Sequence, residues 1–336
     1  MKSKKSLSIN DIARLSGVST ATVSHVLNRK GRYSEETEKR VREVIEQYGY
    51  VSNNAARSLK SSSSHTIGLI LPNMSNDFFS SIAVSAEQYC DSMDYSLFIC
   101  NTDNSPEKEL RYFRKLDSMR VDGILVISCM KMIERDILSR DIPVVLIDRT
   151  PLNNMDLPYV TSDIYTGIYS ATESLIKKGC RHIAFVSSFL ATYIPTYRKQ
   201  PYLDAMHAHQ LNADESTIIQ LKAGSSLINA ETEVYQYLLN HPDMDGLICT
   251  SDNQAIGALT ALRRANKRVP EDVMVFGFDN QFQSRICTPP LSTIERYPSE
   301  IGKQAAEKLL QLIRKEPVEK RTVLQCSVIE RESTDR

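Results

Sequence analysis

The chain has 336 residues, more than one hydrophobic core usually supports, so two or more domains are expected. Hydrophobic residues make up 41% and charged residues 24%, a composition that excludes fibrous and disordered proteins. The net charge is zero, but residues 1–60 carry twelve Lys/Arg against six Asp/Glu, a charge of +6, which leaves −6 on the remainder. A basic head on an acidic body predicts a polyanionic partner for the head.

The start of the chain, MKSKKSLSIN, is charged, but no apolar segment follows it, so we expect no signal peptide. No run approaches the roughly 18 apolar residues that a membrane span needs. The seven cysteines are odd in number, lie far apart and lack metal-binding spacing, so reduced core thiols are expected. These features predict a cytoplasmic protein without a cofactor.

Residues 8–27 are predicted to form two short helices joined at Gly17, with Ser8 and Ser19 placed to cap them. A third helix is predicted over 34–47. The helical spacing leaves four residues on the outer face of the second helix: Thr20, Ala21, Ser24 and His25. This pattern is typical of a helix-turn-helix, whose second helix enters the major groove of DNA, but it also fits other small helical hairpins.

Residues 50–64 combine a short helical patch with a run of serines and are predicted to be a linker. Beyond them, short apolar runs alternate with amphipathic stretches. Strands are predicted at 66–71, 95–100, 122–127, 143–147, 182–187, 217–221, 245–249 and 273–277, and helices near 164–178, 198–209, 228–240 and 252–265. The alternation predicts an α/β body with two parallel, doubly wound sheets and a ligand cleft between them.

The segment LSINDIARLSGVSTATVSHVLN resembles the head of the lactose/galactose repressor family, most closely its purine-repressor type. NNAARSLK resembles the hinge helix of that family, SNDFF its first cleft segment, VPEDVMVFGFDN its last core strand, and TPPLSTIERYPSEIGKQAAEKLL its final crossover and helix. The resemblance therefore covers nearly the whole chain.

The resemblance implies three regions: a helix-turn-helix domain at 1–51, a hinge helix and linker at 52–63, and an effector-binding and dimerisation body at 64–336. The body is expected to have the two-lobed fold of periplasmic binding proteins. Its N-terminal lobe is placed at about 64–161 and 296–322, and its C-terminal lobe at about 162–295 and 323–336.

The resemblance also implies which residues contact DNA. Positions that meet bases or adjacent phosphates fall on Thr20, Ala21, Thr22, Ser24 and His25, and positions that hold the DNA backbone fall on Ser8, Ser19, Asn28, Arg32 and Tyr50. Leu59 lies where the family inserts a leucine into a minor-groove base step, with Ala56 allowing close approach and Lys60 supplying phosphate charge. The alternatives are a solvated helix face and a leucine that packs the linker onto the body.

Family positions in the effector cleft fall on Phe78, Phe79, Asp148, Arg198, Ser251 and Asp279. Aromatic faces suit a sugar or a nucleobase, and an arginine with two carboxylates can bind hydroxyls. The alternatives are core phenylalanines and a turn-forming Asp279. Ser251 replaces the usual asparagine, Ser226 lies near a position that is aromatic in the purine type, and Thr192 replaces that type's first pocket arginine. These departures disfavour a purine and favour a sugar or sugar derivative as inducer.

The resemblance implies a transcriptional repressor that binds a pseudo-palindromic operator in double-stranded DNA as a homodimer under a small, sugar-like effector. The sequence contains no nucleophile elbow, phosphate-binding loop or metal cluster, so an enzyme is not expected. Two alternatives remain: a global catabolite-type regulator controlled by a partner protein, and a free sugar-binding protein, which would need a signal segment instead of a basic head. The C-terminal segment has no leucine heptads, which favours a dimer over a tetramer.

Overall fold

The computed structural model describes residues 7–27, 31–50, 63–133, 137–151, 153, 156–188, 194–222 and 226–336. The chain divides into two compact units, Met1–Ser64 and His65–Arg336, which we call the head and the body. Apart from Ser63, the expected hinge at 52–63 lies outside the described residues.

The head contains three short helices: α1 (Ile9–Ser16), α2 (Thr20–Leu27) and α3 (Glu35–Tyr48). Ser8 forms a capping box with Asp11 at the start of α1, and the Ser34 side chain caps α3. Gly17 ends α1 in the left-handed conformation, with φ of 67°, which favours glycine. A small apolar core holds the helices together: Ile12, Ala13, Val23, Val26 and Val41.

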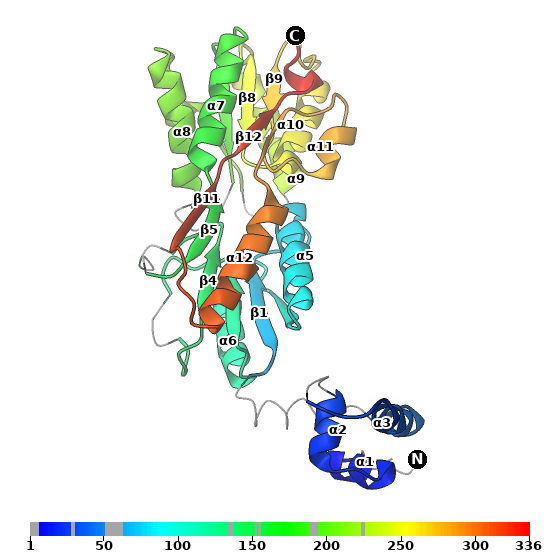
Figure 1. Cartoon of the computed structure of the whole chain (residues 1–336). Helices are drawn as coiled ribbons and strands as arrows, with labels where there is room; N and C mark the ends of the chain where they lie inside the picture. Colours follow the sequence, from blue (N-terminus) through cyan, green and yellow to red (C-terminus); the bar gives the residue numbers. More distant parts are fainter. Residues whose placement is uncertain are drawn as a thin grey trace. The chain divides into compact units, whose positions relative to one another are not determined.

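The first lobe of the body is built on a six-stranded parallel sheet in the order β11-β5-β4-β3-β1-β2. Its strands are β1 (Thr66–Leu71), β2 (Ser96–Asn101), β3 (Gly123–Val126), β4 (Val144–Ile147), β5 (Tyr159–Ser162) and β11 (Arg321–Leu324). Helices α5 (Asp77–Ser92) and α12 (Pro298–Ile313) cover one face and α6 (Pro106–Ser118) the other (Figure 1). Successive residues of β1 serve opposite faces, since Leu69 packs toward α5 and Ile70 toward α6.

The second lobe is built on a four-stranded parallel sheet in the order β7-β6-β8-β9. Its strands are β6 (Ile183–Ser187), β7 (Ile218–Gln220), β8 (Gly246–Cys249) and β9 (Met274–Phe276). One face is covered by α9 (Ser226–Asn240) and α10 (Asp252–Arg264), and the other by α7 (Ile164–Lys177) and α8 (Ile194–Ala208). The short helices are α11 (Phe282–Ile286), η1 (Glu215–Thr217) and η2 (Glu332–Thr334).

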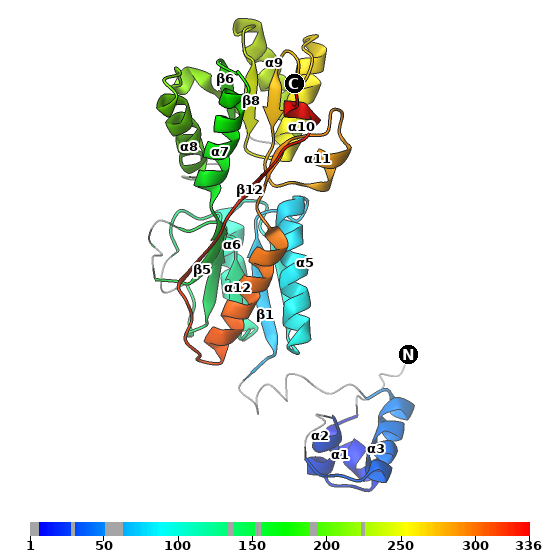
Figure 2. The same cartoon turned by 45° about the horizontal axis from the view of Figure 1, so that its top comes forward.

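The chain passes between the lobes from β5 into α7, from β10 (Thr293–Glu295) into α12, and from β11 into β12 (Ser327–Ile329). We call these connections the crossover segments. β10 and β12 pair in antiparallel fashion, and the two segments lie side by side in both views (Figures 1 and 2). β11 pairs in register with β5 up to Leu324, so the lobe boundary expected at about 322 falls within this strand.

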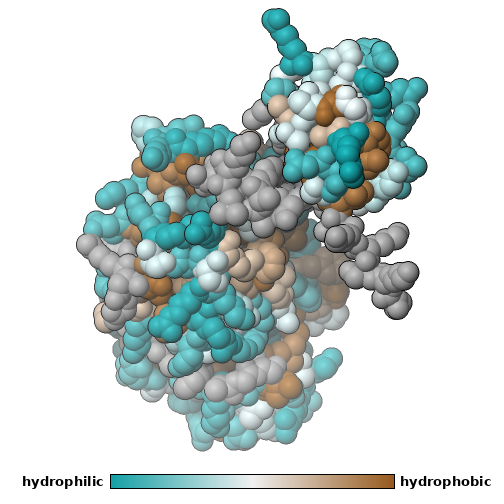
Figure 3. Space-filling view, turned by 90° about the horizontal axis from the view of Figure 1, so that it is seen from below, coloured by the Kyte–Doolittle hydropathy of each residue, from teal (hydrophilic) through white to brown (hydrophobic). Residues whose placement is uncertain are grey.

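The predicted α/β fold class is confirmed, and all eight predicted body strands are present with ends that differ by no more than one residue. β5 and β10 were not predicted, because their segments, YVTS and TIE, lack the short apolar run that marked the predicted strands. The surface seen in Figure 3 is mainly hydrophilic, with small separate hydrophobic patches. Among the described residues, no helix is both long and apolar enough to span a membrane.

Candidate functional site

One face of α2 is polar, and the opposite face is anchored in the head core. The residues predicted to meet bases all lie on α2, where Thr20, Ala21 and His25 are exposed and Thr22 and Ser24 are half-buried. On the opposite face Val23 and Val26 are buried at 0% and 1% exposure. The helix is therefore held by two valines while its short polar face stays accessible, as insertion into a DNA groove requires.

The serines predicted to hold the DNA backbone also define the starts of the helices. Ser19 Oγ accepts a hydrogen bond from the Thr22 main-chain nitrogen at 3.1 Å and lies 2.9 Å from Thr22 Oγ1. Ser8 Oγ donates to Asp11 Oδ2 at 2.7 Å. These bonds orient the helix N-termini, whose main-chain N–H groups are a standard binding site for phosphate.

The remaining predicted DNA contacts differ in their surroundings. Arg32 is exposed, whereas Tyr50 is half-buried against the head core. His25 lies close to the loop backbone, since a Cβ on Gly31 would lie 2.7 Å from His25 Nδ1. Four predicted contacts lie outside the described residues: Asn28, Ala56, Leu59 and Lys60.

The six predicted effector residues come from both lobes of the body. In the first lobe Phe78 and Phe79 lie in the first turn of α5 and Asp148 follows β4; in the second lobe Arg198 lies in α8, Ser251 caps α10 and Asp279 follows β9. Asp148 and Asp279 have φ of 61° and 100°, a region that non-glycine residues seldom adopt. Such backbone strain is concentrated at functional sites.

The structure brings Phe78, Asp148 and Asp279 together around Arg296, a residue that the sequence analysis did not name. The Arg296 guanidinium donates to Asp148 Oδ1 in the first lobe and, at 3.1 Å, to Asp279 Oδ1 in the second. Its Nε donates to Ser162 Oγ at 2.9 Å, and its carbon lies 3.9 Å from the Phe78 ring centroid. The Arg296 side chain is only 1% exposed, so this ion-pair cluster bridges the lobes out of contact with water.

The other predicted cleft residues surround this cluster. Arg198 Nη1 donates to the Thr250 carbonyl at 3.0 Å, and its guanidinium lies 5.0 Å from the ring of Phe278, which Arg296 also contacts at 5.1 Å. Ser251 Oγ accepts from the Gln254 main-chain nitrogen at 3.3 Å as the cap of α10.

Phe79 lies on the first-lobe side of the cleft, where it packs edge-on against Phe78 with their ring centroids 5.6 Å apart. The Arg149 guanidinium lies over the Phe79 ring, 5.2 Å from its centroid. The rings of Phe78, Phe79 and Phe278 thus each have an arginine guanidinium over them.

Burial and charge act in opposite directions on the two cleft carboxyls. Burial alone would raise the pKa of Asp148, but the guanidinium groups of Arg296, Arg198 and Arg149 hold it below its usual value. For Asp279, burial outweighs Arg296 and raises the pKa to about 6. Burial and the charge of Arg296 lower the pKa of Arg198 to about 10.

Asp252 fixes the loop that carries Asp279. Its carboxylate accepts hydrogen bonds at 2.6 Å from the Gln281 main-chain nitrogen and from Thr293 Oγ1. Gly277 allows this approach, because a Cβ there would lie 2.2 Å from Asp252 Oδ1. Burial raises the pKa of Asp252 to about 7.

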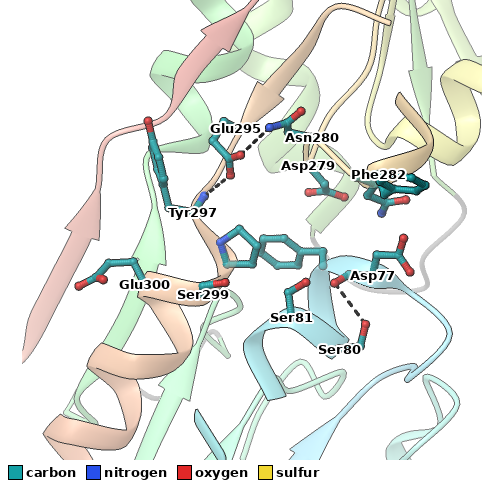
Figure 4. Close-up of a pocket in the computed structure, with 13 residues that line it drawn as sticks. Asp77, Ser80, Ser81, Asp279, Asn280, Phe282, Glu295, Tyr297, Ser299 and Glu300 are labelled. Carbon is teal, nitrogen blue, oxygen red and sulfur yellow. Dashed lines mark hydrogen bonds between the residues drawn. The ribbon is translucent and has the colours of Figure 1, made fainter. Parts of the chain in front are cut away.

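A cavity of about 510 Å³ adjoins the cluster between the N-terminal ends of α5 and α12 (Figure 4). It shares Phe78 and Asp279 with the predicted cleft. Four carboxylates line it without a described lysine or arginine among the lining residues: Asp77, Asp279, Glu295 and Glu300. Glu295 is held in place by hydrogen bonds from Asn280 Nδ2 at 2.7 Å and the Tyr297 main-chain nitrogen at 2.6 Å.

Arg296, Arg149 and Phe278 were not predicted from the sequence. A charged residue in a connection is ordinarily solvated, so the segment TIERYP indicated only a crossover. The one sequence feature that could have marked Arg296 is its position, because it directly follows β10, where the chain passes between the lobes. All seven cysteines carry free thiols, and the described residues contain no group of three acidic, Cys or His side chains able to hold a metal.

Comparisons with known proteins agree with this geometry. Residues 8–53 match the family described as bacterial regulatory proteins, lacI family, and residues 172–334 match the periplasmic binding protein-like domain. The chain is 35% identical to the HTH-type transcriptional repressor PurR of Vibrio atlanticus over 93% of this chain and 94% of that protein. It is 36% identical to the HTH-type transcriptional regulator RegA of Clostridium saccharobutylicum over 97% and 99%.

Solved structures share the whole fold. A lac repressor dimer bound to operator and the anti-inducer ONPF superposes with a TM-score of 0.87 at 21% identity, covering 98% of this chain and 99% of that chain. A complex of the regulator CelR with cellobiose has a TM-score of 0.71 at 26% identity, covering 97% and 99%. Because its curated relatives extend over nearly its full length, the chain belongs to the lacI family of bacterial regulatory proteins and is a DNA-binding transcriptional repressor, not an enzyme.

Proposed function

We propose that this repressor binds a pseudo-palindromic operator as a homodimer and that a small, sugar-like effector in the cleft between the lobes changes its operator affinity. The observation that carries the proposal is that one chain combines a basic helical head with a two-lobed body whose lobes are joined by buried ion pairs. A head of charge +6 presents the polar face of α2, while the body joins Asp148 and Asp279 of opposite lobes through Arg296. If the two lobes move relative to each other, the ion pairs of Arg296 with Asp148 and Asp279 must change.

In this proposal α2 enters the major groove and each head reads one half-site. Thr20, Ala21, Thr22, Ser24 and His25 meet bases or nearby phosphates, and Ser8, Ser19, Asn28, Arg32 and Tyr50 hold the backbone. Leu59, with Ala56 and Lys60, enters the minor groove from a hinge helix within 52–63. A helix this short is not stable alone, so it forms only where two chains and DNA meet.

The effector assignment is supported by the composition of the cleft and by relatives that carry sugars. The CelR structure is described as a complex with cellobiose. A periplasmic binding protein/LacI transcriptional regulator from Alkaliphilus metalliredigens, 30% identical with a TM-score of 0.69 over 81% of this chain and 100% of that chain, is described with D-xylulofuranose. In this proposal Phe78, Phe79 and Arg198 line the site, with the guanidinium of Arg296 over the Phe78 ring and that of Arg149 over the Phe79 ring. We place this activity in the cytoplasm, with DNA and a small molecule as the partners.

The proposal is tested by selecting operators from random DNA with the full-length protein and measuring affinity by fluorescence anisotropy. We expect two-fold symmetric sites, an affinity that falls steeply with salt, and a several-fold change in affinity when the effector is added, as a coupling of about 1–3 kcal/mol produces. Binding with no preference for symmetric sites, or a sugar panel that leaves operator affinity unchanged, would contradict the proposal.

A further inference from the structure

The cleft contains more guanidinium donors than its carboxylates satisfy. Arg296 bonds to Asp148 and Asp279, and so engages both acids that the sequence analysis expected to bind hydroxyls. Arg149 Nε lies 3.9 Å from Asp148 Oδ2, and Arg198 Nη1 donates a hydrogen bond to the Thr250 carbonyl.

Two of these arginines keep buried donors without a partner. Within the described part of the chain, Arg149 Nε and Nη1 and Arg198 Nε are buried and donate to no hydrogen-bond acceptor. The Arg149 side chain is 10% exposed. Their guanidinium carbons lie over the rings of Phe79 and Phe278, 5.2 and 5.0 Å from the ring centroids, and the unpaired N–H groups are the part still able to bind a ligand. Buried donors of charged groups are costly when unpaired, so a ligand with acceptor oxygens stabilises this arrangement.

Two nearby acids, Glu109 and Asp252, already accept hydrogen bonds from other groups. Glu109, which is also near Arg149, accepts hydrogen bonds from Ser128 Oγ at 2.5 Å and from the Cys129 main-chain nitrogen at 2.7 Å. Asp252 binds Gln281 and Thr293. A neutral sugar needs acceptors as well as donors, whereas the free groups of Arg149 and Arg198 are donors only.

We propose, building on the effector-controlled repressor above, that the effector carries an anionic group, a carboxylate or a phosphate, which Arg149 and Arg198 bind. Guanidinium groups match the oxygens of both anions through paired, charge-assisted hydrogen bonds. Arg296 acts as an internal cation for Asp148 and Asp279, which leaves Arg149 and Arg198 as the groups that can bind acceptor oxygens. Neither of these two arginines lines the acidic cavity at Asp77, Glu295 and Glu300. The effector class becomes that of sugar acids or sugar phosphates.

The test compares anions with their neutral counterparts on the full-length protein. Thermal unfolding is followed at matched ionic strength. Each anion is compared with its neutral counterpart: D-galacturonate with D-galactose, D-gluconate with D-glucose, and glucose 6-phosphate with glucose. Sodium chloride and sodium sulfate are the inorganic controls. The proteins are the wild type, Arg149→Gln/Arg198→Gln and the control Arg114→Gln, which alters an exposed arginine of α6. We expect at least one anion to stabilise the wild type and Arg114→Gln more than its neutral counterpart, and to bind the double variant at least tenfold more weakly by calorimetry.

The arms separate the two sources of negative charge, since a uronate or aldonate reports a carboxylate site and the phosphate ester a phosphate site. Arg198→Lys keeps the positive charge but loses the paired N–H donors of the guanidinium, so it should bind the anion with intermediate affinity. This variant tests the inference if the double variant does not fold. The inference is overturned if no anion exceeds chloride, if neutral sugars act equally, or if the double variant responds like the wild type. Operator binding is measured in parallel, so the proposed repressor function is tested separately from the anionic nature of the effector.

Discussion

Arg296 is the residue on which the two lobes converge, and its loss isolates two buried carboxylates. We expect Arg296→Met to lower the free energy of unfolding of the body by about 3–5 kcal/mol, because removing one partner of a buried ion pair leaves an uncompensated charge. Urea unfolding followed by circular dichroism measures this loss. The matched control is Arg268→Met, whose pair with Asp272 is 70% exposed on the arginine side and should matter little. Equal effects of the two variants would contradict the assignment.

His25 is exposed on α2, where we propose that it meets a base. We expect His25→Ala to weaken operator binding by about 1–3 kcal/mol, since this is the range for one good base contact. Leu59→Ala should weaken operator binding through loss of the proposed minor-groove contact. Anisotropy titrations with the selected operator measure the DNA affinity, and calorimetry with the identified effector should show unchanged binding in both variants. If both variants bound the operator as tightly as the wild type, the proposed DNA contacts of His25 and Leu59 would be wrong.

At the scale of elements, the packing of α12 on α5 depends on Gly302. A Cβ at this position would lie 2.3 Å from the Ile82 carbonyl oxygen of α5. Helix propensity alone predicts that Gly→Ala stabilises a helix by about 0.5–1 kcal/mol. We expect the opposite sign for Gly302→Ala, a lower melting temperature in calorimetry, because the two helices must move apart. The neighbouring exposed Lys303→Ala is the control and should leave the melting temperature nearly unchanged. A stabilised Gly302→Ala would show that α12 can shift without cost.

The positions of most helices and strands could be predicted from the sequence, but the contacts between them could not. Strand positions followed from apolar runs and helix starts from capping serines, because these signals lie within a few residues of one another. The close approach at Gly302 left no local trace, since a glycine inside a helical pattern is compatible with many causes.

At the scale of the whole molecule, two buried carboxyls link folding to pH. Burial raises the pKa of Asp252 to about 7 and of Asp279 to about 6, from 3.8, so the folded protein binds protons that the unfolded chain has released. Their contribution to stability is full below about pH 4 and is lost as pH rises through 6 and 7. We expect the body to be less stable at pH 8 than at pH 6 by about 1 kcal/mol from Asp252 alone.

Urea unfolding at the two pH values measures this difference. Asp252→Asn should reduce the pH dependence, whereas Asp91→Asn, at an exposed position of α5, should preserve it. A wild type whose stability is greater at pH 8 would contradict the sign. Below pH 4 the lowered pKa of Asp148 acts the other way, because its protonation removes the ion pair with Arg296.

The sequence by itself determined the order of the elements, the basic head and its polar reading face, because composition, periodicity and caps are local properties. It also placed Asp148 and Asp279 at strand ends, where a cleft forms between parallel sheets. Only the tertiary structure decided that Arg296 joins them, because its partners lie 148 and 17 residues away along the chain. The charge of the cleft follows from those distant pairings, since an arginine bound to two acids leaves the remaining arginines, Arg149 and Arg198, with donors to spare.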